Sequence, residues 1–254
     1  NYLNIMKPLL RGRDVHKNSI SWAGLWLIVA KNGINIPNDY KGIYEYFQSF
    51  GTKIQNRSDR GDHWWNLRSC SYYDDFNSEK IIYPETTVRR SEFYLDTDNY
   101  YIDKTCFMIT GECLPYIQAV LSSRLMEWYL ESELRLLGKS SIQYSKQFIE
   151  LTPVPRIKAQ KQKPFIVFVN YIKVLNQNNK HLVVSHFLED VINSMVYELY
   201  FPDEVSAADA NILQHLDKLP NIQPLIEKGE TEKALKNIEK VYREFSAPHH
   251  PVSI

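Results

Sequence analysis

The sequence predicts an α+β protein, with a mixed α/β first part followed by an all-helical second part. Two observations predict this class. Short runs of β-branched and aromatic residues, bounded by Gly, Pro, Asn and Asp, recur before residue 155. After residue 165 the apolar residues recur at helical spacing. Between the two parts, RIKAQKQKP at residues 156–164 is polar, basic and bounded by prolines, which makes it the best candidate for a linker.

The first part begins with a strand signal and a helix signal. Residues 21–30 have the length and composition of a strand, and the apolar run LWLIVA at 25–30 predicts that it is buried. The turn-rich residues 31–39 lead into an expected helix at 40–50, where Ile43, Tyr44, Phe47 and Phe50 have helical spacing. Residues 64–69 predict a short strand or a turn.

Three strands and a long helix are expected next. The strands are at 80–84, 92–95 and 105–110, the first ended by proline and the last by glycine. Over residues 114–136 the spacing predicts one amphipathic helix with a face made of Ile117, Val120, Leu121, Leu125, Trp128 and Tyr129. Gly138 would end this helix. Residues 144–149 predict a short strand or a turn.

The second part predicts helices alone. They are expected at 165–175 and 181–201, where Pro202 stops the second one, and at 206–219 and 231–245. Ser206 is the expected N-cap of the third helix, and the 246–254 tail is not helical. We therefore expect two domains, residues 1–160 and residues 161–254.

Composition and charge indicate an ordinary globular protein. Hydrophobic residues make up 44% of the 254 residues and charged residues 24%, values that disordered chains do not reach. The net charge of zero hides an asymmetry, because 22 Lys and Arg stand against 18 Asp and Glu up to residue 163, and 8 against 12 after it. The basic excess in the first part permits a nucleic-acid partner and proves none.

The cysteines and the apolar runs indicate the cellular compartment that is expected for the protein. The three cysteines form no CxxC pair and have no zinc-finger spacing with histidine, so reduced thiols in a cytoplasmic protein are expected. The sequence has no signal peptide and no apolar run long enough to span a bilayer, so no membrane partner is expected. We expect the chain to be part of something longer on its amino-terminal side.

The most informative stretch is RSDRGDHWWNLR at residues 57–68. It combines three arginines with two adjacent tryptophans, Trp64 and Trp65, which face opposite ways if the segment is a strand. Arginine beside an exposed aromatic ring suits phosphates and base edges. The alternative is a core tryptophan pair with arginines in solvated ion pairs.

Three further basic motifs have both a functional and a structural interpretation. Arg11-Gly12-Arg13 suits close approach of the backbone to a ligand, or is a charged surface loop. Arg89-Arg90 either reaches a groove or is solvated. Gly138-Lys139-Ser140 lacks the earlier glycine of a phosphate-binding loop, since position 133 is Glu133; it is an exposed turn that meets a DNA phosphate, a helix C-cap, or both.

No catalytic or metal-binding set can be assembled from the sequence. His186, Glu189 and Asp190 do not form HExxH and are expected on a solvated helix face. GxSxG, GxGxxG and a Cys/His nucleophile context are missing as well. We therefore expect no catalytic residue, no metal ligand and no cofactor-binding residue in this chain.

Five segments in order carry a resemblance to a known family. They are KPLLRGRDV, RSDRGDHWWNLRSCSYYDDFNSEKIIYPE, TCFMITG, AVLSSRLMEWYL and GKSSIQYSKQFIELTPVP. Together, over residues 5–155, the chain resembles the TaqI-like C-terminal specificity domain, the target-recognition part of adenine-specific DNA methyltransferases fused into type IIG restriction-modification enzymes. The helical remainder, with FLEDVINSMVYELYFPDEV, resembles the helices that follow such domains as a spacer.

The resemblance implies a DNA reader without its own chemistry. A preceding methyltransferase domain would flip an adenine and methylate its N6 from S-adenosylmethionine. The Asn-Pro-Pro-Tyr motif of that domain and its cofactor loop are missing here, so the chain alone should bind double-stranded DNA and catalyse nothing. A nuclease domain, if the full protein has one, would also lie elsewhere.

The family motif maps onto specific positions of this sequence. The matching positions are Arg57, Asp59, Gly61, Trp64, Trp65, Arg68, Gly138, Lys139, Ser140, Tyr144 and Ser145. With the neighbouring basic residues, the expected DNA-binding set is Arg11, Arg13, Arg57, Arg60, Trp64, Trp65, Arg68, Arg89, Lys139, Ser140, Tyr144 and Lys146. Arg57, Arg60 and Lys139 are expected at phosphates or base edges, and the tryptophans are expected to brace the loop. Base-reading residues are expected elsewhere, for instance in residues 31–39 or 71–79.

The leading hypothesis is therefore a specificity domain with a helical spacer. The alternative is a protein-interaction module, a specificity subunit that docks a separate methyltransferase subunit through its acidic helical half. An enzyme with an unrecognised site is the third possibility. The sequence does not reveal the recognised bases, the oligomeric state, or whether the parent enzyme cleaves DNA.

Overall fold

The computed structural model describes residues 2–88, 91–133, 135–137, 141–178 and 182–253, and has the expected α+β class. The helices are α1 Ile36–Asp39, α2 Lys41–Gln48, α3 Thr52–Gln55, α4 Leu114–Leu121, α5 Arg124–Glu133, α6 Lys146–Glu150, α7 Ala159–Gln177, α8 Leu182–Tyr200, α9 Pro202–Ala207, α10 Gln223–Glu227 and α11 Thr231–Phe245. The strands are β1 Met6–Leu10, β2 Val15–His16, β3 Ser19–Ile20, β4 Trp26–Ile28, β5 Lys80–Pro84, β6 Thr86–Thr87, β7 Tyr94–Asp96, β8 Tyr101–Ile102, β9 Cys106–Ile109, β10 Arg135–Leu137 and β11 Ser141–Gln143. Short 3₁₀ turns lie at η1 Tyr2–Asn4, η2 Gly12–Asp14, η3 Asp74–Asn77 and η4 Leu213–His215.

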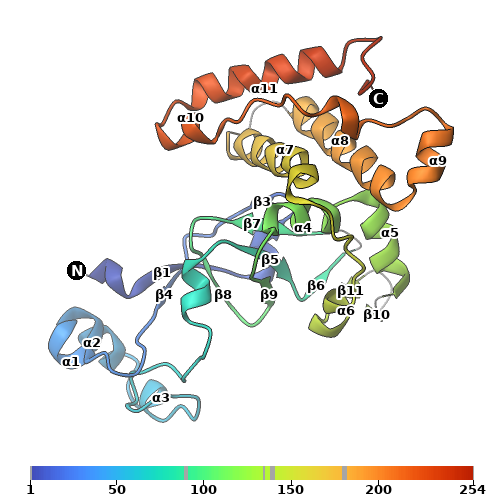
Figure 1. The fold of residues 1–254 in the computed structure, drawn as a ribbon. Helices are drawn as coiled ribbons and strands as arrows, with labels where there is room; N and C mark the ends of the chain where they lie inside the picture. Colours follow the sequence, from blue (N-terminus) through green and yellow to red (C-terminus); the bar gives the residue numbers. More distant parts are fainter. Residues whose placement is uncertain (1, 89–90, 134, 138–140, 179–181, 254) are drawn as a thin grey trace.

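Small sheets form the middle of the molecule, and helices lie on opposite sides of it (Figure 1). β5 is the centre of the order β7-β5-β9 and is antiparallel to both neighbours. β1 is the centre of β4-β1-β8, antiparallel to β4 and parallel to β8. The other sheets are β10-β11-β6 and the β2-β3 pair. Helices α7, α8 and α11 form a layer on one side, whereas α1, α2 and α3 project on the other.

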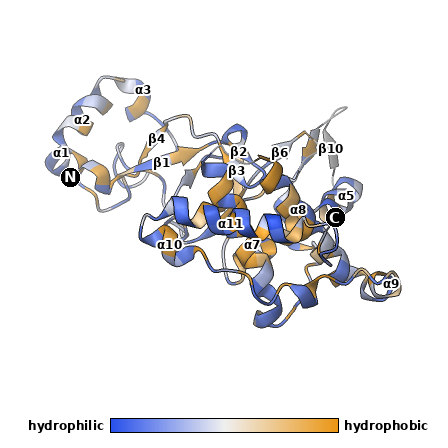
Figure 2. Ribbon diagram, turned by 90° about the horizontal axis from the view of Figure 1, so that it is seen from above, coloured by the Kyte–Doolittle hydropathy of each residue, from blue (hydrophilic) through white to orange (hydrophobic). Residues whose placement is uncertain are grey.

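The helical layer and the sheets share one hydrophobic core, which we call the main core. Its buried residues come from both parts of the chain, for example Ile81 and Val120 from the first and Phe168 and Val196 from the second. α11 contributes its apolar face to this core, and the ribbon of Figure 2 colours most of its residues hydrophilic. The domain boundary near residue 160 stays a prediction, but no break in the core marks it.

Polar contacts also join the helical layer to the first part. The Glu189 carboxylate lies 3.2 Å from the Lys17 ammonium and accepts a hydrogen bond from the side-chain amide Nδ2 of Asn18 at 2.8 Å. Asp190 lies 2.9 Å from the Arg124 guanidinium. The expectation that these two acidic residues lie on a solvated face was wrong, because both carboxylates bridge to the first part of the chain.

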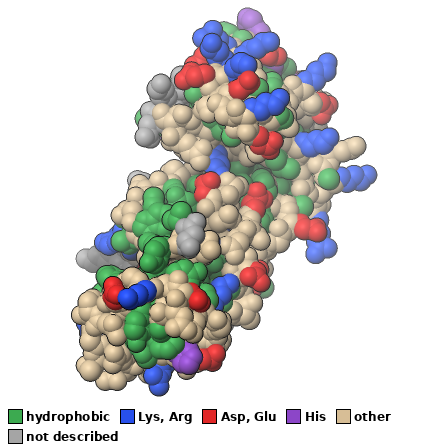
Figure 3. Space-filling model, turned by 90° about the vertical axis from the view of Figure 1, so that its left-hand side faces the viewer, with side chains coloured by type: hydrophobic (Ala, Val, Ile, Leu, Met, Phe, Trp, Pro, Cys, Tyr) green, Lys and Arg blue, Asp and Glu red, His purple; other side chains and the backbone are tan. Residues whose placement is uncertain are grey.

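A second, smaller core supports a projecting lobe, which we call the small lobe (residues 31–68). Its buried residues are Ile5, Ala30, Ile36, Ile43 and Phe47. α2 supplies the last two from the helical spacing recognised in the sequence, so the helix expected at residues 40–50 is confirmed. Apolar side chains also cover part of the outer surface of this lobe (Figure 3). Tyr46 and Phe50 are exposed residues of the lobe.

The expected single helix over residues 114–136 is two helices, α4 and α5, with a break at Ser122 and Ser123. The Ser123 hydroxyl donates to the carbonyl of Val120 at 2.7 Å and accepts from the amide of Met126 at 3.2 Å, so it caps the second helix. The break changes the phase of the apolar face, and Trp128, expected on that face, is 67% exposed.

The prediction of a linker at residues 156–164 is wrong for its second half, because α7 begins at Ala159 and contains Pro164. Pro164 and Phe165 are buried there. Pro164 is the sixth residue of α7, so it removes the hydrogen bond that an N–H at this position would donate to the carbonyl of Gln160. The buried apolar residues outweigh this loss.

Three other expectations were also wrong in detail. The apolar run at 25–30 is half exposed where β4 forms a sheet edge, with Trp26 46% exposed. Residues 144–149 contain the start of helix α6. Ser206 is not an N-cap but lies inside α9, and only the short turn η4 forms between α9 and Leu219.

A fully buried ion pair ties the central sheet together. The Lys80 ammonium on β5 lies 2.5 Å from the Asp96 carboxylate on β7, and both side chains are 0% exposed. Lys80 also donates to the carbonyl of Phe76 at 2.9 Å. The Asp96 carboxylate accepts from the amides of Asp98 at 2.8 Å and Tyr100 at 2.9 Å. These bonds satisfy both charges without water.

Lys80→Met removes the ammonium and leaves the Asp96 carboxylate buried without a cation. We expect the free energy of unfolding to fall by about 3–5 kcal/mol, because the remaining charge is uncompensated. Urea unfolding followed by tryptophan fluorescence measures this loss. The matched change, Lys104→Met in an exposed turn, is expected to stay within about 0.5 kcal/mol of wild type. A stable Lys80→Met protein would contradict the assignment.

Candidate nucleic-acid interface

Residues 57–68, which we call the tryptophan loop, form a turn held by one buried asparagine. Asn66 is 0% exposed. Its amide nitrogen donates to the carbonyls of Lys31 at 2.9 Å and Ile34 at 3.3 Å, and its Oδ1 accepts from the amide of His63 at 3.2 Å. The loop is therefore fixed to residues 31–34, with no strand in it.

Arg57 and Gly61 stabilise the loop from within. The Arg57 guanidinium donates to the carbonyl of Asn66, and the amide of Gly61 donates to the same oxygen at 3.1 Å. Arg57 is half-buried, and its Nε has no partner among the described residues. A Cβ atom on Gly61 would lie 2.0 Å from Oδ1 of Asn32 and 2.6 Å from the carbonyl of Leu67, so only glycine fits.

Both tryptophans rest against the small lobe. Trp64 contacts the rings of Tyr44 and Phe47, with centroids 5.7 and 6.4 Å away. Trp65 contacts Tyr44 at 6.2 Å and stacks on His63 at 4.4 Å. Because the segment is a turn, the two rings need not face opposite ways, and both pack on the same core. Their position is that of braces for the loop.

Arg60 and Arg68 lie on the outside of the loop. Both are exposed. The Arg68 Nε is 3.3 Å from Asp59, with the two side chains 76% and 70% exposed, so this pair contributes little stability. The Arg68–Asp59 contact is a solvated ion pair, which the alternative interpretation of residues 57–68 predicts for the arginines. No ion pair of Arg60 occurs within the described part of the chain.

The loop meets both segments in which base-reading residues were expected. The carbonyl of Arg68 accepts from the Tyr73 hydroxyl at 3.1 Å. The Lys31 ammonium lies over the Tyr73 ring at 4.5 Å and 3.7 Å from Asp74. Contacts thus join residues 31–39, 57–68 and 71–79, and we call the exposed side of these three segments the three-loop surface.

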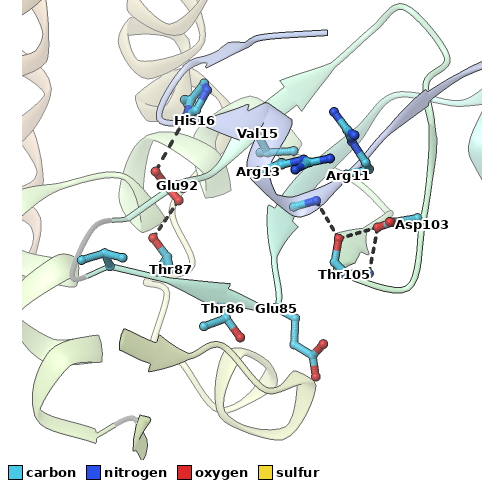
Figure 4. Close-up of a pocket in the computed structure, with 12 residues that line it drawn as sticks. Arg11, Arg13, Val15, His16, Glu85, Thr86, Thr87, Glu92, Asp103 and Thr105 are labelled. Atoms are coloured by element: carbon cyan, nitrogen blue, oxygen red, sulfur yellow. Dashed lines mark hydrogen bonds and ion pairs between the residues drawn. The ribbon is translucent and has the colours of Figure 1, made fainter. Parts of the chain in front are cut away.

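A separate cleft of about 660 Å³ lies beside the Arg11–Asp14 turn (Figure 4). The amide of Gly12 donates to the Thr105 hydroxyl at 2.7 Å, and a Cβ on Gly12 would lie 2.8 Å from the Thr105 carbonyl. The Arg11 guanidinium donates two hydrogen bonds, of 2.9 and 2.8 Å, to the carboxylate of Asp14. Arg13 is exposed at the cleft.

Both signs of charge line this cleft. Arg11, Arg13 and His16 face Glu85, Glu92 and Asp103. Glu92 accepts from the Thr87 hydroxyl at 2.7 Å and lies 3.9 Å from His16 (Figure 4). Such a surface suits hydrogen bonds to base edges better than a uniform run of phosphates. Among the described residues that line it, none is Phe, Tyr or Trp.

Two of the remaining expected residues have clear positions. Tyr144 was expected at DNA, and this is wrong, because its side chain is 1% exposed in the main core and burial raises its pKa. Lys146 is 71% exposed and lies 3.5 Å from Glu150. Arg89, Gly138, Lys139 and Ser140 lie outside the described residues.

Sequence reasoning missed several residues of these sites. Asn66 follows directly after the tryptophans, and its small polar side chain next to an apolar pair is the signal that was overlooked. Thr87, Glu92 and Thr105 reach the cleft from segments more than 70 residues beyond Arg13, and no local pattern could have placed them there.

Asn66→Ala tests the loop anchor. The change removes the side-chain donor of the Ile34 carbonyl and leaves the Lys31 carbonyl with the Ile34 amide alone, so we expect a loss of about 1–3 kcal/mol in the free energy of unfolding. Urea unfolding measures it. Asn38→Ala, at an exposed residue of the same lobe, is the matched control and should change stability by less than about 0.5 kcal/mol. Equal effects in the two variants would rule out the anchor.

The Arg11–Asp14 pair gives a pH-dependent prediction. Arg11 holds the pKa of Asp14 below its ordinary value. The stabilisation is complete above the unfolded pKa of about 4 and is lost as the pH falls through the lower folded pKa. Wild type and Asp14→Asn should therefore differ in unfolding free energy by a constant amount between about pH 5 and 7, and converge below about pH 4. A difference that persists at about pH 2 would contradict this assignment.

Comparison with known proteins gives one family. The sequence model of the TaqI-like C-terminal specificity domain matches residues 7–154, more than half of the chain. No curated protein matches the chain. In the described residues no cluster of three or more metal-ligating side chains occurs, and no helix has the length and apolarity to cross a membrane.

Proposed function

The chain belongs to the TaqI-like C-terminal specificity domain family, and from this premise we propose that it reads a short sequence of double-stranded DNA for an adenine-N6 methyltransferase. Recognition of DNA targets in restriction-modification systems is the role that this family suggests. The three-loop surface is the observation that carries the proposal for this chain, because it places Arg60 and Arg68 outward on a fixed backbone.

The exposed arginines of this surface have the chemistry that reading requires. A guanidinium can donate two parallel hydrogen bonds to guanine O6 and N7, and each such pair discriminates against a wrong base by about 1–3 kcal/mol. Arg13 and the carboxylates of the cleft offer a second set of donors and acceptors. The fixed loop reduces the entropy lost on binding.

The catalytic step belongs to a methyltransferase domain of the same or a partner chain. S-adenosylmethionine would bind that domain, whose Asn-Pro-Pro-Tyr motif is not found in this sequence. In this proposal the chain is non-catalytic, works in the cytoplasm, and holds the DNA while the partner methylates it. A fused nuclease, as in type IIG enzymes, is compatible with the same division.

The alternative role for the helical half is docking of a separate methyltransferase subunit. The shared main core gives the helices a structural role that requires no partner subunit. We therefore prefer the fused arrangement. Mixing this chain with the methyltransferase encoded by the same locus, followed by size-exclusion chromatography, would distinguish a stable complex from independent elution.

Arg60→Gln and Arg68→Gln test the reading surface. Duplexes selected from a random pool by the wild-type chain should share a short motif, and each variant should lower the ratio of motif to random affinity by about 5–150-fold. The reason is the lost pair of hydrogen bonds to a base. Fluorescence anisotropy at fixed salt gives both affinities.

Arg243→Gln is the matched control for Arg68→Gln. Arg243 is 79% exposed and lies 3.7 Å from Glu239 on α11. The Arg243→Gln variant therefore also lacks one exposed, loosely paired guanidinium. For this control, the ratio of the affinity for the motif to the affinity for a random duplex should equal that of wild type. A wild-type chain that enriches no motif, or binds no duplex at low salt, would overturn the proposed function.

A further inference from the structure

The start of the helical layer contains four cations that the reading surface does not use. Arg156, Lys158, Lys161 and Lys163 are all exposed. They form what we call the basic stretch, residues 156–163. No Asp or Glu occurs between Glu150 and Glu189, which is the longest interval without acidic residues in the chain. A chain of zero net charge thus concentrates positive charge here.

The backbone of the basic stretch is fixed, although its composition suggested a linker. The hydroxyl of Tyr116 donates to the carbonyl of Pro155 at 2.8 Å, and Tyr200 donates to the carbonyl of Pro153. Ile157 packs against the main core. Gln162 donates to the carbonyl of Ile157 at 3.1 Å across the start of α7. The apolar residues therefore face inward while the four cations face the solvent.

The four cations have no ion pair within the described part of the chain, whereas other exposed cations do. Lys146 lies 3.5 Å from Glu150, and Lys233 lies 3.0 Å from Glu230. An external anion can therefore bind the basic stretch without first displacing an internal carboxylate.

We propose that the basic stretch binds the phosphate backbone of the same DNA duplex that the three-loop surface reads, an inference that rests on the proposed function. The four cations occur within eight residues, from the extended residues before α7 into its first two turns. Lysine acts as a flexible point charge, which suits phosphates and carries no base preference. The family match ends at residue 154, so these residues lie beyond the matched domain.

In this proposal the basic stretch and the three-loop surface contribute to DNA affinity in different ways. Phosphate contacts release counterions, so each one adds about 0.9 to the slope of log affinity against log salt. Contacts to base edges set the preference for one sequence over another. The basic stretch should therefore govern salt dependence and leave discrimination unchanged.

The test uses the full 254-residue chain with all four residues of the basic stretch changed, Arg156→Gln, Lys158→Gln, Lys161→Gln and Lys163→Gln. Affinities for the selected duplex and for a random duplex are measured across a salt series. We expect the slope of log affinity against log salt to become shallower by about 2–4, and the ratio of the two affinities to remain within about twofold of wild type. The double variants Arg156→Gln/Lys158→Gln and Lys161→Gln/Lys163→Gln should each give about half of the change, and they serve if the quadruple variant does not fold.

A second quadruple variant controls for net charge. Lys228, Lys233, Lys236 and Lys240 are exposed on or beside α10 and α11, where Glu230, Glu232 and Glu239 lie between them. On the face shown in Figure 3, Lys and Arg of the helical layer are interspersed with Asp and Glu. Changing these four lysines to glutamine removes the same charge and should alter the salt slope by less than about 1.

The outcomes separate this inference from the proposed function. A wild-type slope in the basic-stretch variant, or equal changes in the two quadruple variants, would overturn the phosphate contact while sequence-specific binding by wild type stands. Loss of discrimination in the basic-stretch variant would also overturn it, because the stretch would then contact bases. If the wild-type chain binds no duplex, both proposals fail.

Discussion

The buried Lys80–Asp96 pair is the constraint on which the central sheets and the interface both depend. The ammonium on β5 and the carboxylate on β7 are sealed from water, so each must keep every partner it has. Their bonds reach the carbonyl of Phe76 in η3 and the amides of Asp98 and Tyr100 in the turn before β8. Phe76 stacks on Tyr101 at 4.5 Å, which joins η3 to the β1 sheet. The pair thereby fixes residues 71–79, one side of the three-loop surface.

Rigid and exposed residues have separate tasks at this surface. Asn66, Gly61 and Arg57 hydrogen-bond within the loop or to residues 31–34, and the two tryptophans pack on the small lobe, so these residues define the shape of the loop. Arg60 and Arg68 project from that frame with little internal pairing. Because hydrogen bonds to backbone groups hold this frame, it can remain unchanged when the outward side chains are substituted.

Local patterns in the sequence predicted the elements whose stability is local. α11 matches the expected helix at 231–245, and β5 matches the strand at 80–84, because each has a full period of apolar residues between clear boundary residues. The errors have physical causes that a linear pattern does not contain. Ser123 closes a cap on Met126, Pro164 is accepted because its neighbours are buried, and Tyr144 lies in a core built from both ends of the chain. Of the candidate interface, residues 57–68 were predicted from composition, whereas the cleft is formed by segments that only the fold brings together.

The continuous main core has a consequence for protein engineering. Apolar side chains from α7, α8 and α11 fill the same interior as those from β5 and α4, and Glu189 and Asp190 join the two parts from the surface. A chimera that joins part of this chain to another protein would expose this interior if its junction fell near residue 160. The exchangeable unit is the matched domain together with its trailing helices, grafted as one body.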